Sequence, residues 1–186
     1  MTGYAEIARA YRDAAPTLRT QWRDVNIERW RAPMAAWLNG KRILDVGAGT
    51  GELASHLAER AFVTAVEPTA ALWDSALPRL DDRLPRLARV RGRFDLVLCL
   101  SVFHHLTPRD QVRAFQRLAA LTAPGGRLIL ALRHGRAGTR TWPVRAAHLR
   151  ATGFHRRRLH RRGALQPASA ARGVRFTWVI FENRAR

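Results

Sequence analysis

Residues 43–60 read ILDVGAGTGELASHLAER, and they indicate most about how the chain folds. The apolar run over 42–46 predicts a short buried strand, and the spacing of apolar residues over 52–60 predicts a helix. Between them stand three glycines, Gly47, Gly49 and Gly51. Because glycine has no Cβ, it permits a tight turn and lets a ligand lie against the backbone. The stretch therefore predicts a strand, a glycine turn and a helix that together bind a ligand.

The glycine spacing also limits the kind of ligand. The dinucleotide fingerprint G-x-G-x-x-G requires a glycine at position 52, where this chain has Glu52. The spacing G-x-G-x-G, with Asp45 two residues ahead of the first glycine, suits a nucleoside ligand without a pyrophosphate. Asp45 would repel a diphosphate and attract a cationic ligand such as a sulfonium amino acid.

A second apolar strand, predicted over 62–66, ends in Glu67-Pro68. A carboxylate at this place, twenty residues past Gly47, can accept hydrogen bonds from both hydroxyls of a ribose. The alternative is a simple glycine turn with a solvated Glu67. The order of strand, glycines, helix, strand and acid favours the nucleoside site.

Strands and helices alternate through the rest of the chain. Further strands are predicted over 94–100, 128–132 and 174–181, and further helices over 70–77, 108–121 and 144–152. Residues 84–90 predict either a short strand or a bare connection, and Pro124-Gly125-Gly126 predicts a turn. Because such alternation gives right-handed crossovers, it predicts an α/β fold with a doubly wound, mostly parallel sheet and helices on both faces.

The N-terminal region has the pattern of amphipathic helices. Apolar and aromatic residues recur at three- and four-residue steps over 4–38, which predicts two or three helices with boundaries at Pro16 and Pro33. The length of 186 residues favours a single domain. Its expected parts are a helical cap over 1–39, a ligand-binding core over 40–135, and a helix with antiparallel strands over 136–186.

The chain is strongly basic. It has 33 Lys and Arg against 14 Asp and Glu, a formal net charge of +19, which would favour nucleic acid through counterion release. Lys41 is the only lysine, however, and the arginines are spread over nearly every segment, which is more typical of coding bias than of a phosphate-binding surface. The one dense cluster, 155–162, is interpreted either as a solvated hairpin or loop or as an anion-binding patch.

Other features of the composition exclude several classes of protein. A hydrophobic fraction of 47% is typical of a globular chain and excludes disorder throughout. No apolar stretch approaches the ~20 residues that span a bilayer, and the first residues lack the pattern of a signal peptide, so we expect a cytoplasmic protein without a membrane partner. Cys99 is the only cysteine, which excludes an intrachain disulfide and a cysteine-built zinc site, and no metal is expected.

Four stretches carry recognisable motifs: 43–60, 63–68, FDLVLCLSVFHHL at 94–106 and LTAPGGRLILAL at 121–132. In order and spacing they resemble the first, second, fourth and fifth strand motifs of the class I S-adenosylmethionine-dependent methyltransferases. The resemblance is closest to the small single-domain members that act on small molecules. It implies a Rossmann-like sheet of seven strands, of which one can be short or missing, and an N-terminal helical cap. It also implies S-adenosylmethionine as cofactor and S-adenosylhomocysteine as product.

The same resemblance implies which residues bind the cofactor. The glycines would lie along its methionine and ribose parts, Glu67 would bind the ribose hydroxyls, and Leu100 and Ser101 would approach its sulfur. Asp82, or else Asp81, would bind the adenine amino group, and the alternative is two solvated loop acids. The expected cofactor contacts are Tyr11, Asp45, Gly47, Ala48, Gly49, Gly51, Glu67, Pro68, Asp82, Leu100 and Ser101. Tyr4 and Trp22 are the other aromatic candidates of the N-terminal helices, and core packing is the alternative for Trp22.

Residues that follow the fourth and fifth strands would face the methyl acceptor. His104 and His105 could take a proton from an attacking hydroxyl, amine or thiol. The alternative is that alignment alone drives the transfer, and that one of the two histidines packs against or caps the next helix. Arg133 and His134 are the expected acceptor-binding residues, with Arg133 fixing a carboxylate or phosphate. The alternative for Arg133 is a surface ion pair.

Motifs that are absent narrow the acceptor. Family members that methylate base amino groups carry Asn or Asp, then Pro-Pro and an aromatic residue, where this chain reads LSVF at 100–103. Cys99 follows leucine, whereas the nucleophile of the cytosine-carbon enzymes follows proline. We therefore expect a methyltransferase that acts on a small molecule by in-line displacement. The alternatives are a methyltransferase for RNA or an RNA-bound protein, and a non-catalytic methyltransferase-like protein that binds the cofactor or a partner.

Overall fold

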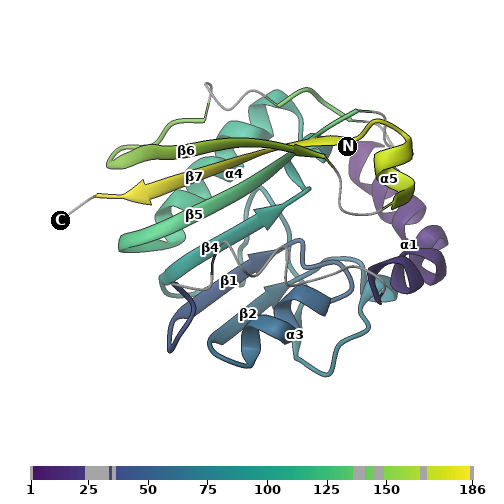
Figure 1. Cartoon of the computed structure of the whole chain (residues 1–186), viewed down its shortest axis with the longest axis horizontal. Helices are drawn as coiled ribbons and strands as arrows, with labels where there is room; N and C mark the ends of the chain where they lie inside the picture. The colour runs from purple at the N-terminus through teal and green to yellow at the C-terminus, as the bar shows by residue number, and fades with distance from the viewer. Residues whose placement is uncertain are drawn as a thin grey trace.

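A seven-stranded sheet forms the centre of the protein in the computed structural model (Figure 1). Its strands follow the order β3-β2-β1-β4-β5-β7-β6. The first five strands pair in parallel, while β7 runs antiparallel to both β5 and β6. The strands are β1 Arg42–Val46, β2 Phe62–Val66, β3 Arg79–Leu80, β4 Phe94–Leu100, β5 Thr122–His134, β6 Phe154–Gly163 and β7 Arg175–Asn183. The predicted α/β fold with a mostly parallel seven-stranded sheet is confirmed.

The structure describes residues 2–23, 34, 37–135, 141–144, 149–163 and 167–184. The predicted helix boundary at Pro33 and the middle of the predicted helix over 144–152 lie outside these residues. The described ends of that predicted helix are not helical. Residues 151–154 form a turn into β6 instead, because Gly153 adopts a φ of 77° and the Phe154 N–H donates to the Ala151 carbonyl at 3.1 Å.

Helices cover both faces of the sheet. α3 (Glu52–Ala58) contributes Leu53 and Leu57 to the apolar cluster of one face, and α4 (Pro108–Leu121) contributes Phe115 to the cluster of the other. Figure 1 shows these two helices on opposite sides of the strands. Neighbouring residues of β4 alternate between the two clusters, as side chains in a strand do. Because helices cover both faces of this strand, residues 96–100 form a continuous apolar run.

Two helices that begin with proline differ in how well the sequence predicts them. α4 begins at Pro108 as predicted, because the Thr107 hydroxyl oxygen accepts the Asp110 N–H at 3.2 Å and proline suits the first helical position. α5 (Pro167–Ala171) also begins with a proline, but the sequence analysis did not predict it. None of the helices in the described part of the chain is both long and apolar enough to cross a membrane.

α1 (Thr2–Arg23) crosses the end of the sheet toward which the parallel strands point (Figure 1). It passes through Pro16 without a break, so the prediction of a helix boundary there is wrong. Proline removes one backbone hydrogen bond from a helix, but contacts beyond Pro16 stabilise the remaining turns. The Arg19 guanidinium donates to the carbonyls of Ala71 and Trp73, at 2.6 and 3.1 Å. Within the described residues the expected N-terminal cap is therefore this one helix.

Two segments between β2 and β4 differ from the prediction. Residues 70–77 contain only a short 3-10 helix, η2 (Ala70–Leu72), because Trp73 turns to an extended conformation and the Asp74 N–H donates to the Thr50 carbonyl at 2.9 Å. The third strand lies at Arg79–Leu80, and 84–90 is the bare connection rather than a strand.

β5 is longer than predicted because it includes the expected turn over 124–126. The register between β4 and β5 shifts between Phe94 and Leu96, so these extra residues form a bulge within the strand. Gly125 has a φ of 72°, a conformation that favours glycine. The glycine pair therefore bends a strand instead of ending one.

Candidate active site

Four side chains meet on one face of the sheet, at the end where the parallel strands stop. Asp45 lies in β1, Glu67 follows β2, Leu100 ends β4 and Arg133 lies near the end of β5. The register pairs Asp45 with Ala65, Asp45 with Leu98, and Leu100 with Ala131. Because side chains alternate between faces, residues two positions apart on a strand share a face. Glu67, Leu100 and Arg133 therefore lie on the same face as Asp45, which is the face that α3 covers.

The glycine turn after β1 is held against the end of β2. The N–H groups of Gly47 and Ala48 both donate to the Val66 carbonyl, at 2.8 and 3.0 Å. Gly47 has a φ of 75°, and a Cβ there would lie 2.3 Å from Val102 Cγ2. Gly49 has a φ of 61°, but an added Cβ would meet no atom of the described part of the chain within 4 Å. The turn thus combines one tightly packed glycine with one that borders open space, where a ligand can lie against the backbone.

This difference between the two glycines gives a stability prediction. Alanine at either position adopts an unfavourable positive φ, which costs about 1–2 kcal/mol. Gly47→Ala adds the clash with Val102, so we expect it to lower the free energy of unfolding by about 1–3 kcal/mol more than Gly49→Ala does. Urea unfolding of both variants tests this. Gly47→Ala combined with Val102→Ala should recover part of the loss, and equal stability of the two single variants would contradict the packing argument.

Glu67 ties the glycine turn to the end of β2. Its side chain is 5% exposed; one carboxylate oxygen accepts the Gly49 N–H at 3.0 Å and the other accepts the Thr69 N–H at 2.8 Å. Burial raises the pKa of Glu67, and the two backbone hydrogen bonds oppose this rise. Next to it, Pro68 is half-buried, and the Arg79 guanidinium donates to the Glu67 carbonyl. Each carboxylate oxygen can accept a further hydrogen bond, so Glu67 can also bind hydroxyl donors.

Asp45 is a buried acid with an unpaired oxygen. It is 3% exposed, and its Oδ2 has no hydrogen-bond partner among the described residues. Burial first, and the charge of Glu67 second, raise the pKa of Asp45 to about 7. An unpaired buried carboxyl is costly, because nothing replaces its lost hydration. The pair of buried acids therefore favours a ligand that brings a positive charge and hydrogen-bond donors.

The backbone turns sharply where β4 ends. Ser101 has a φ of 61°, which is rare for a residue other than glycine and is found most often at functional sites. Its N–H donates to the Ala131 carbonyl at 2.9 Å, which holds the turn against β5. Leu100 and Ser101 are both half-buried at this edge. Their place fits the prediction that they border the ligand.

Asp82 folds the loop that follows β3. Its two carboxylate oxygens accept the N–H groups of Arg83 and Arg89, at 2.8 and 2.5 Å. Asp81 beside it is exposed. The Arg117 guanidinium of α4 anchors this loop by donating to the carbonyls of Arg86, Leu87 and Val90, at 3.0, 3.0 and 3.1 Å. A contact of Asp82 with adenine stays a prediction, and the observed contacts give this acid a structural role in the loop.

Tyr11 of α1 and the two histidines that follow β4 form a cluster. The Tyr11 hydroxyl lies 2.8 Å from His105 Nε2, and the rings of His104 and His105 lie 3.9 Å apart. Burial first, then the charge of His105, then that of Arg133 lower the pKa of His104 to about 2. Burial first and the charge of Arg133 second lower the pKa of His105 to about 4. Burial also raises the pKa of Tyr11 to about 12. At neutral pH the cluster therefore holds two neutral imidazoles and a protonated phenol beside one guanidinium.

The structure separates the two residues expected to bind the acceptor. Arg133 lies on the face of Asp45, and the next residue, His134, necessarily lies on the opposite face. His134 is exposed, and its Nε2 lies 2.9 Å from Thr177 Oγ1 of β7. The structure therefore brings Arg133, but not His134, to the other site residues.

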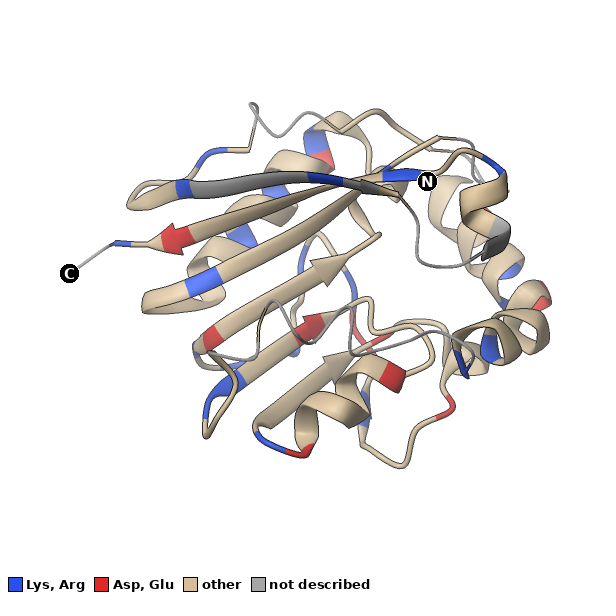
Figure 2. Cartoon of the chain, in the orientation of Figure 1, with Lys and Arg blue, Asp and Glu red and all other residues tan. Residues whose placement is uncertain are grey.

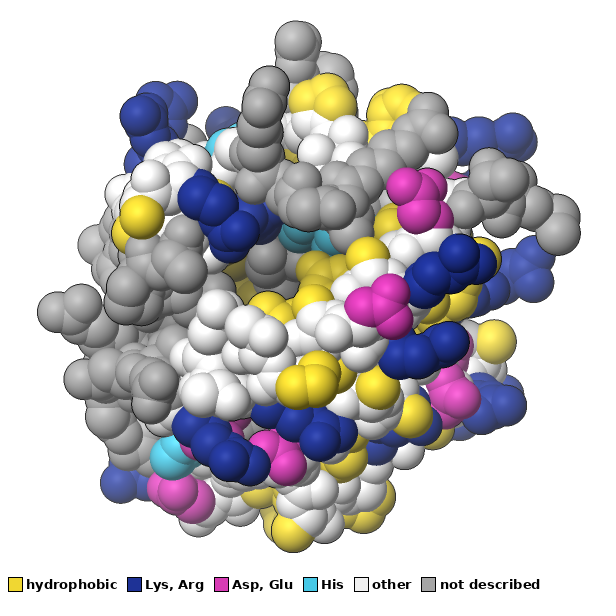
Figure 3. All heavy atoms as spheres, turned by 90° about the vertical axis from the view of Figure 1, so that its right-hand side faces the viewer, with side chains coloured by type: hydrophobic (Ala, Val, Ile, Leu, Met, Phe, Trp, Pro, Cys, Tyr) yellow, Lys and Arg dark blue, Asp and Glu magenta, His cyan; other side chains and the backbone are white. Residues whose placement is uncertain are grey.

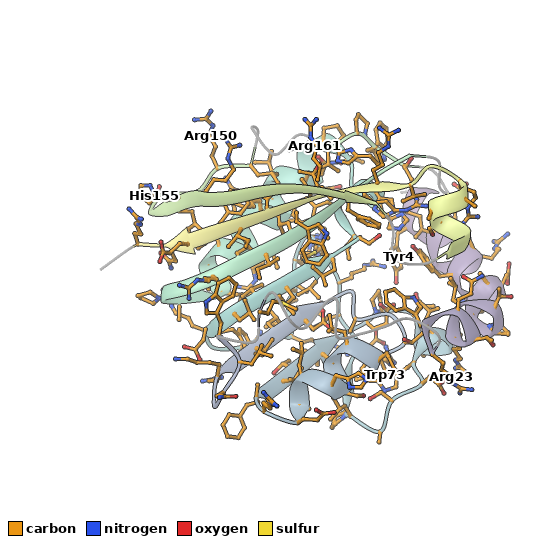
Figure 4. All side chains as sticks on the ribbon, viewed as in Figure 1. Tyr4, Arg23, Trp73, Arg150, His155 and Arg161 are labelled. Atoms are coloured by element: carbon orange, nitrogen blue, oxygen red, sulfur yellow. The ribbon has the colours of Figure 1, made fainter. Side chains whose placement is uncertain are left out.

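Several residues that complete the site were not predicted. Val102 packs against Gly47, and Trp73 and Ser75 would lie within 3 Å of a Cβ at Gly51, which has a φ of 82°. Arg23 of α1 pairs with Asp74 at 2.6 Å, and Arg83 lies 3.6 Å above the Tyr4 ring. Figure 4 shows Tyr4, Arg23 and Trp73 on the α1 side of the sheet. These contacts join elements distant in sequence, so no local pattern could have indicated them.

Residues 43–126 match the family model described as a methyltransferase domain. A ubiquinone biosynthesis O-methyltransferase of Coxiella burnetii is 33% identical over 102 residues, which are 49% of this chain and 43% of that protein. The chain thus spans less than half the length of the curated relatives that it matches.

Solved structures share the fold over nearly the whole chain. The 1,6-didemethyltoxoflavin-N1-methyltransferase of Burkholderia thailandensis, with bound 1,6-didemethyltoxoflavin and S-adenosylhomocysteine, has a TM-score of 0.72 and 21% identity, covering 97% of this chain and 88% of that one. The cyclase SpnF has a TM-score of 0.73 and 15% identity, covering 97% and 96%. Because one neighbour is named a cyclase, the reaction has to be argued from the site rather than from the fold.

Proposed function

We propose that the chain is a class I S-adenosylmethionine-dependent methyltransferase that methylates a small molecule, a proposal supported by its fold and by the match of residues 43–126 to a methyltransferase domain. When bound, S-adenosylmethionine supplies a methyl group attached to a positively charged sulfur; as the acceptor bonds to the methyl carbon, the electrons of the broken C–S bond return to the sulfur. The match of residues 43–126 and the fold support the broader part of the proposal, methyl transfer from this cofactor. The class of acceptor is its narrower part.

The residues of the site fit this cofactor. The unpaired Oδ2 of the buried Asp45 is complementary to a cationic ligand, and the sulfonium amino acid is one. Glu67 can accept hydrogen bonds from ribose hydroxyls, and the open space at Gly49 leaves room against the backbone. The single observation that carries the proposal is this juxtaposition of two buried acids with an open glycine turn.

The chain's own contribution to the transfer would be alignment and exclusion of water. Leu100 and Ser101 border the place where the strands stop, and α1 covers that end of the sheet (Figure 1). His105 is the more accessible of the two histidines to an acceptor, because it is partly exposed whereas His104 is buried, and Tyr11 orients its ring through the 2.8 Å contact. Its low pKa keeps it neutral, so it would orient the attacking atom by a hydrogen bond and take up a proton only as the transfer proceeds.

The distribution of charge favours a small acceptor over RNA. Outside the arginine-rich strand β6, Figure 2 shows the described Lys and Arg scattered over strand ends, loops and α4. Many arginines are also engaged within the fold, as Arg19, Arg79 and Arg117 are with backbone carbonyls. A protein that binds nucleic acid mainly by charge would present a continuous basic surface.

Calorimetry with S-adenosylmethionine and S-adenosylhomocysteine tests the proposal first. We expect each to bind at one site per chain. The acceptor class is then tested by adding cofactor labelled in the methyl group to a cell extract and separating the label by size. Label in molecules small enough to pass a filter would support the proposal, label in RNA or protein would contradict the small acceptor, and binding without transfer would indicate a non-catalytic protein.

A further inference from the structure

Arg79 lies beside the acid that is expected to bind the ribose. It begins the edge strand β3 and is paired with Ala65 of β2, two residues before Glu67. Its guanidinium donates to the Glu67 carbonyl and lies 3.7 Å from a carboxylate oxygen of Asp81. The side chain of Arg79 is 19% exposed and that of Asp81 is 60% exposed. Because water screens an exposed partner, the charge of Arg79 acts more on the buried Glu67 than on Asp81.

The two buried acids of the site differ in what surrounds them. Glu67 accepts the N–H groups of Gly49 and Thr69. These bonds and the charge of Arg79 oppose the rise that burial causes in the pKa of Glu67. Asp45 Oδ2 has no hydrogen-bond partner among the described residues, and burial and the charge of Glu67 both raise the pKa of Asp45. The groups that stabilise a negative charge are therefore gathered on Glu67.

The other titratable groups near the acid pair are uncharged at neutral pH. Burial raises the pKa of Tyr11 to about 12; the charge of Arg133 opposes this rise and that of Glu67 adds to it. Burial, and then the charge of Asp45, raise the pKa of Cys99. Figure 3 looks onto this end of the sheet and shows a hollow with a hydrophobic floor, and the acidic side chains visible in it lie around that hollow. Charges shielded from water by such a surface interact strongly.

We infer that Arg79 is a positioning residue, whose guanidinium keeps the negative charge of the buried acid pair on Glu67 and leaves the proton of the pair on Asp45. The inference rests on the proposed function, since it describes how the cofactor site of that function is charged. Two buried carboxylates repel each other, so the pair retains one proton close to neutral pH. An ionised Glu67 accepts hydrogen bonds from ribose hydroxyls more strongly than a protonated one. Asp45 can then release its proton to water when a cationic cofactor binds.

NMR of the carboxyl carbons in the full chain, with Asp and Glu isotopically labelled, tests where the proton resides without any cofactor. Asp45→Asn and Glu67→Gln assign the two signals. We expect Glu67 to ionise at a lower pH than Asp45 in the wild type. Arg79→Gln keeps N–H donors for the Glu67 carbonyl but removes the charge, so it should raise the pKa of Glu67 and lower that of Asp45. Arg79→Lys keeps the charge and should retain the wild-type titrations.

Calorimetry with S-adenosylhomocysteine gives a second readout. Arg79→Gln should bind it roughly 3- to 10-fold more weakly than the wild type at pH 6. The loss should become smaller toward pH 8, where Glu67 is ionised in both proteins, and Arg79→Lys should follow the wild type. Arg60→Gln is the matched control, since Arg60 is an exposed arginine that follows α3. It should change neither the titrations nor the affinity.

Ionisation of Asp45 at a lower pH than Glu67 in the wild type would overturn the inference, and this result needs no variant of Arg79. Unchanged titrations of both acids in Arg79→Gln would overturn it as well. So would a loss of affinity in Arg79→Gln that is equal at pH 6 and pH 8, because a purely structural role of Arg79 gives that result. Failure of the wild type to bind S-adenosylhomocysteine would instead contradict the proposed function.

Discussion

Replacing Glu67 with alanine is expected to weaken S-adenosylmethionine binding by roughly 10- to 100-fold, which is about 1–3 kcal/mol. The ribose hydroxyls would lose the carboxylate that accepts their hydrogen bonds. The N–H groups of Gly49 and Thr69 would also lose the acceptor oxygens that lie 3.0 and 2.8 Å away. The second loss also loosens the glycine turn. The variant should therefore unfold at lower urea as well as bind less tightly.

Two further variants separate these effects. Glu67→Gln keeps one acceptor oxygen, so it should retain more stability than Glu67→Ala while still binding the cofactor more weakly than wild type. Glu52→Ala removes a partly exposed acid at the start of α3 that lies 3.4 Å from His56, and it should leave cofactor affinity within about twofold. Calorimetry at one pH measures all four proteins. Unchanged affinity in Glu67→Ala would show that this acid does not bind the ligand.

Replacing Asp45 with asparagine is expected to change how stability depends on pH. Burial and Glu67 hold the pKa of Asp45 at about 7 in the folded chain, above the unfolded value of 3.8. Because the folded-state pKa is the higher one, the free energy of unfolding that the neutral carboxyl contributes is fully present below about pH 4 and is lost as the pH rises through 7. Asparagine cannot ionise. The stability of Asp45→Asn relative to wild type should therefore increase between pH 4.5 and 8, by on the order of 3 kcal/mol.

Cofactor affinity of the wild type should respond to pH in the opposite sense to its stability. A cationic ligand favours ionised Asp45, so wild-type affinity for S-adenosylmethionine should rise as the pH rises through about 7. Asp45→Asn should bind more weakly at pH 8 and lose this component of the pH dependence. Thermal unfolding and calorimetry across the range measure both effects. Parallel pH profiles for wild type and variant would contradict a buried, ionisable Asp45 in contact with the ligand.

Much of the fold could be predicted because its signals are local. The apolar runs of β1, β2 and β4 have the length and composition of buried strands, and Gly47 and Gly49 do adopt the positive φ that their place predicts. The helix α4 follows its proline and its apolar spacing. Asp45 and Glu67 end adjacent parallel strands, so topology alone places them together.

The remaining features depend on contacts that the sequence does not show. α1 continues through Pro16 because Arg19 reaches η2, and residues 70–77 lose their helix because the Asp74 N–H bonds to the Thr50 carbonyl. The Asp82 carboxylate is engaged by loop N–H groups, a matter of local geometry rather than of residue type. Arg133 and His134 are neighbours in sequence, yet strand alternation places them on opposite faces.

A crystal structure of the full chain with S-adenosylhomocysteine tests the cofactor site most directly. We predict that the ribose hydroxyls lie within hydrogen-bond distance of the Glu67 carboxylate, that the ligand runs over Gly49, and that its sulfur faces Leu100 and Ser101. A ligand bound elsewhere on the chain, or a ribose out of reach of Glu67, would contradict the account of this site.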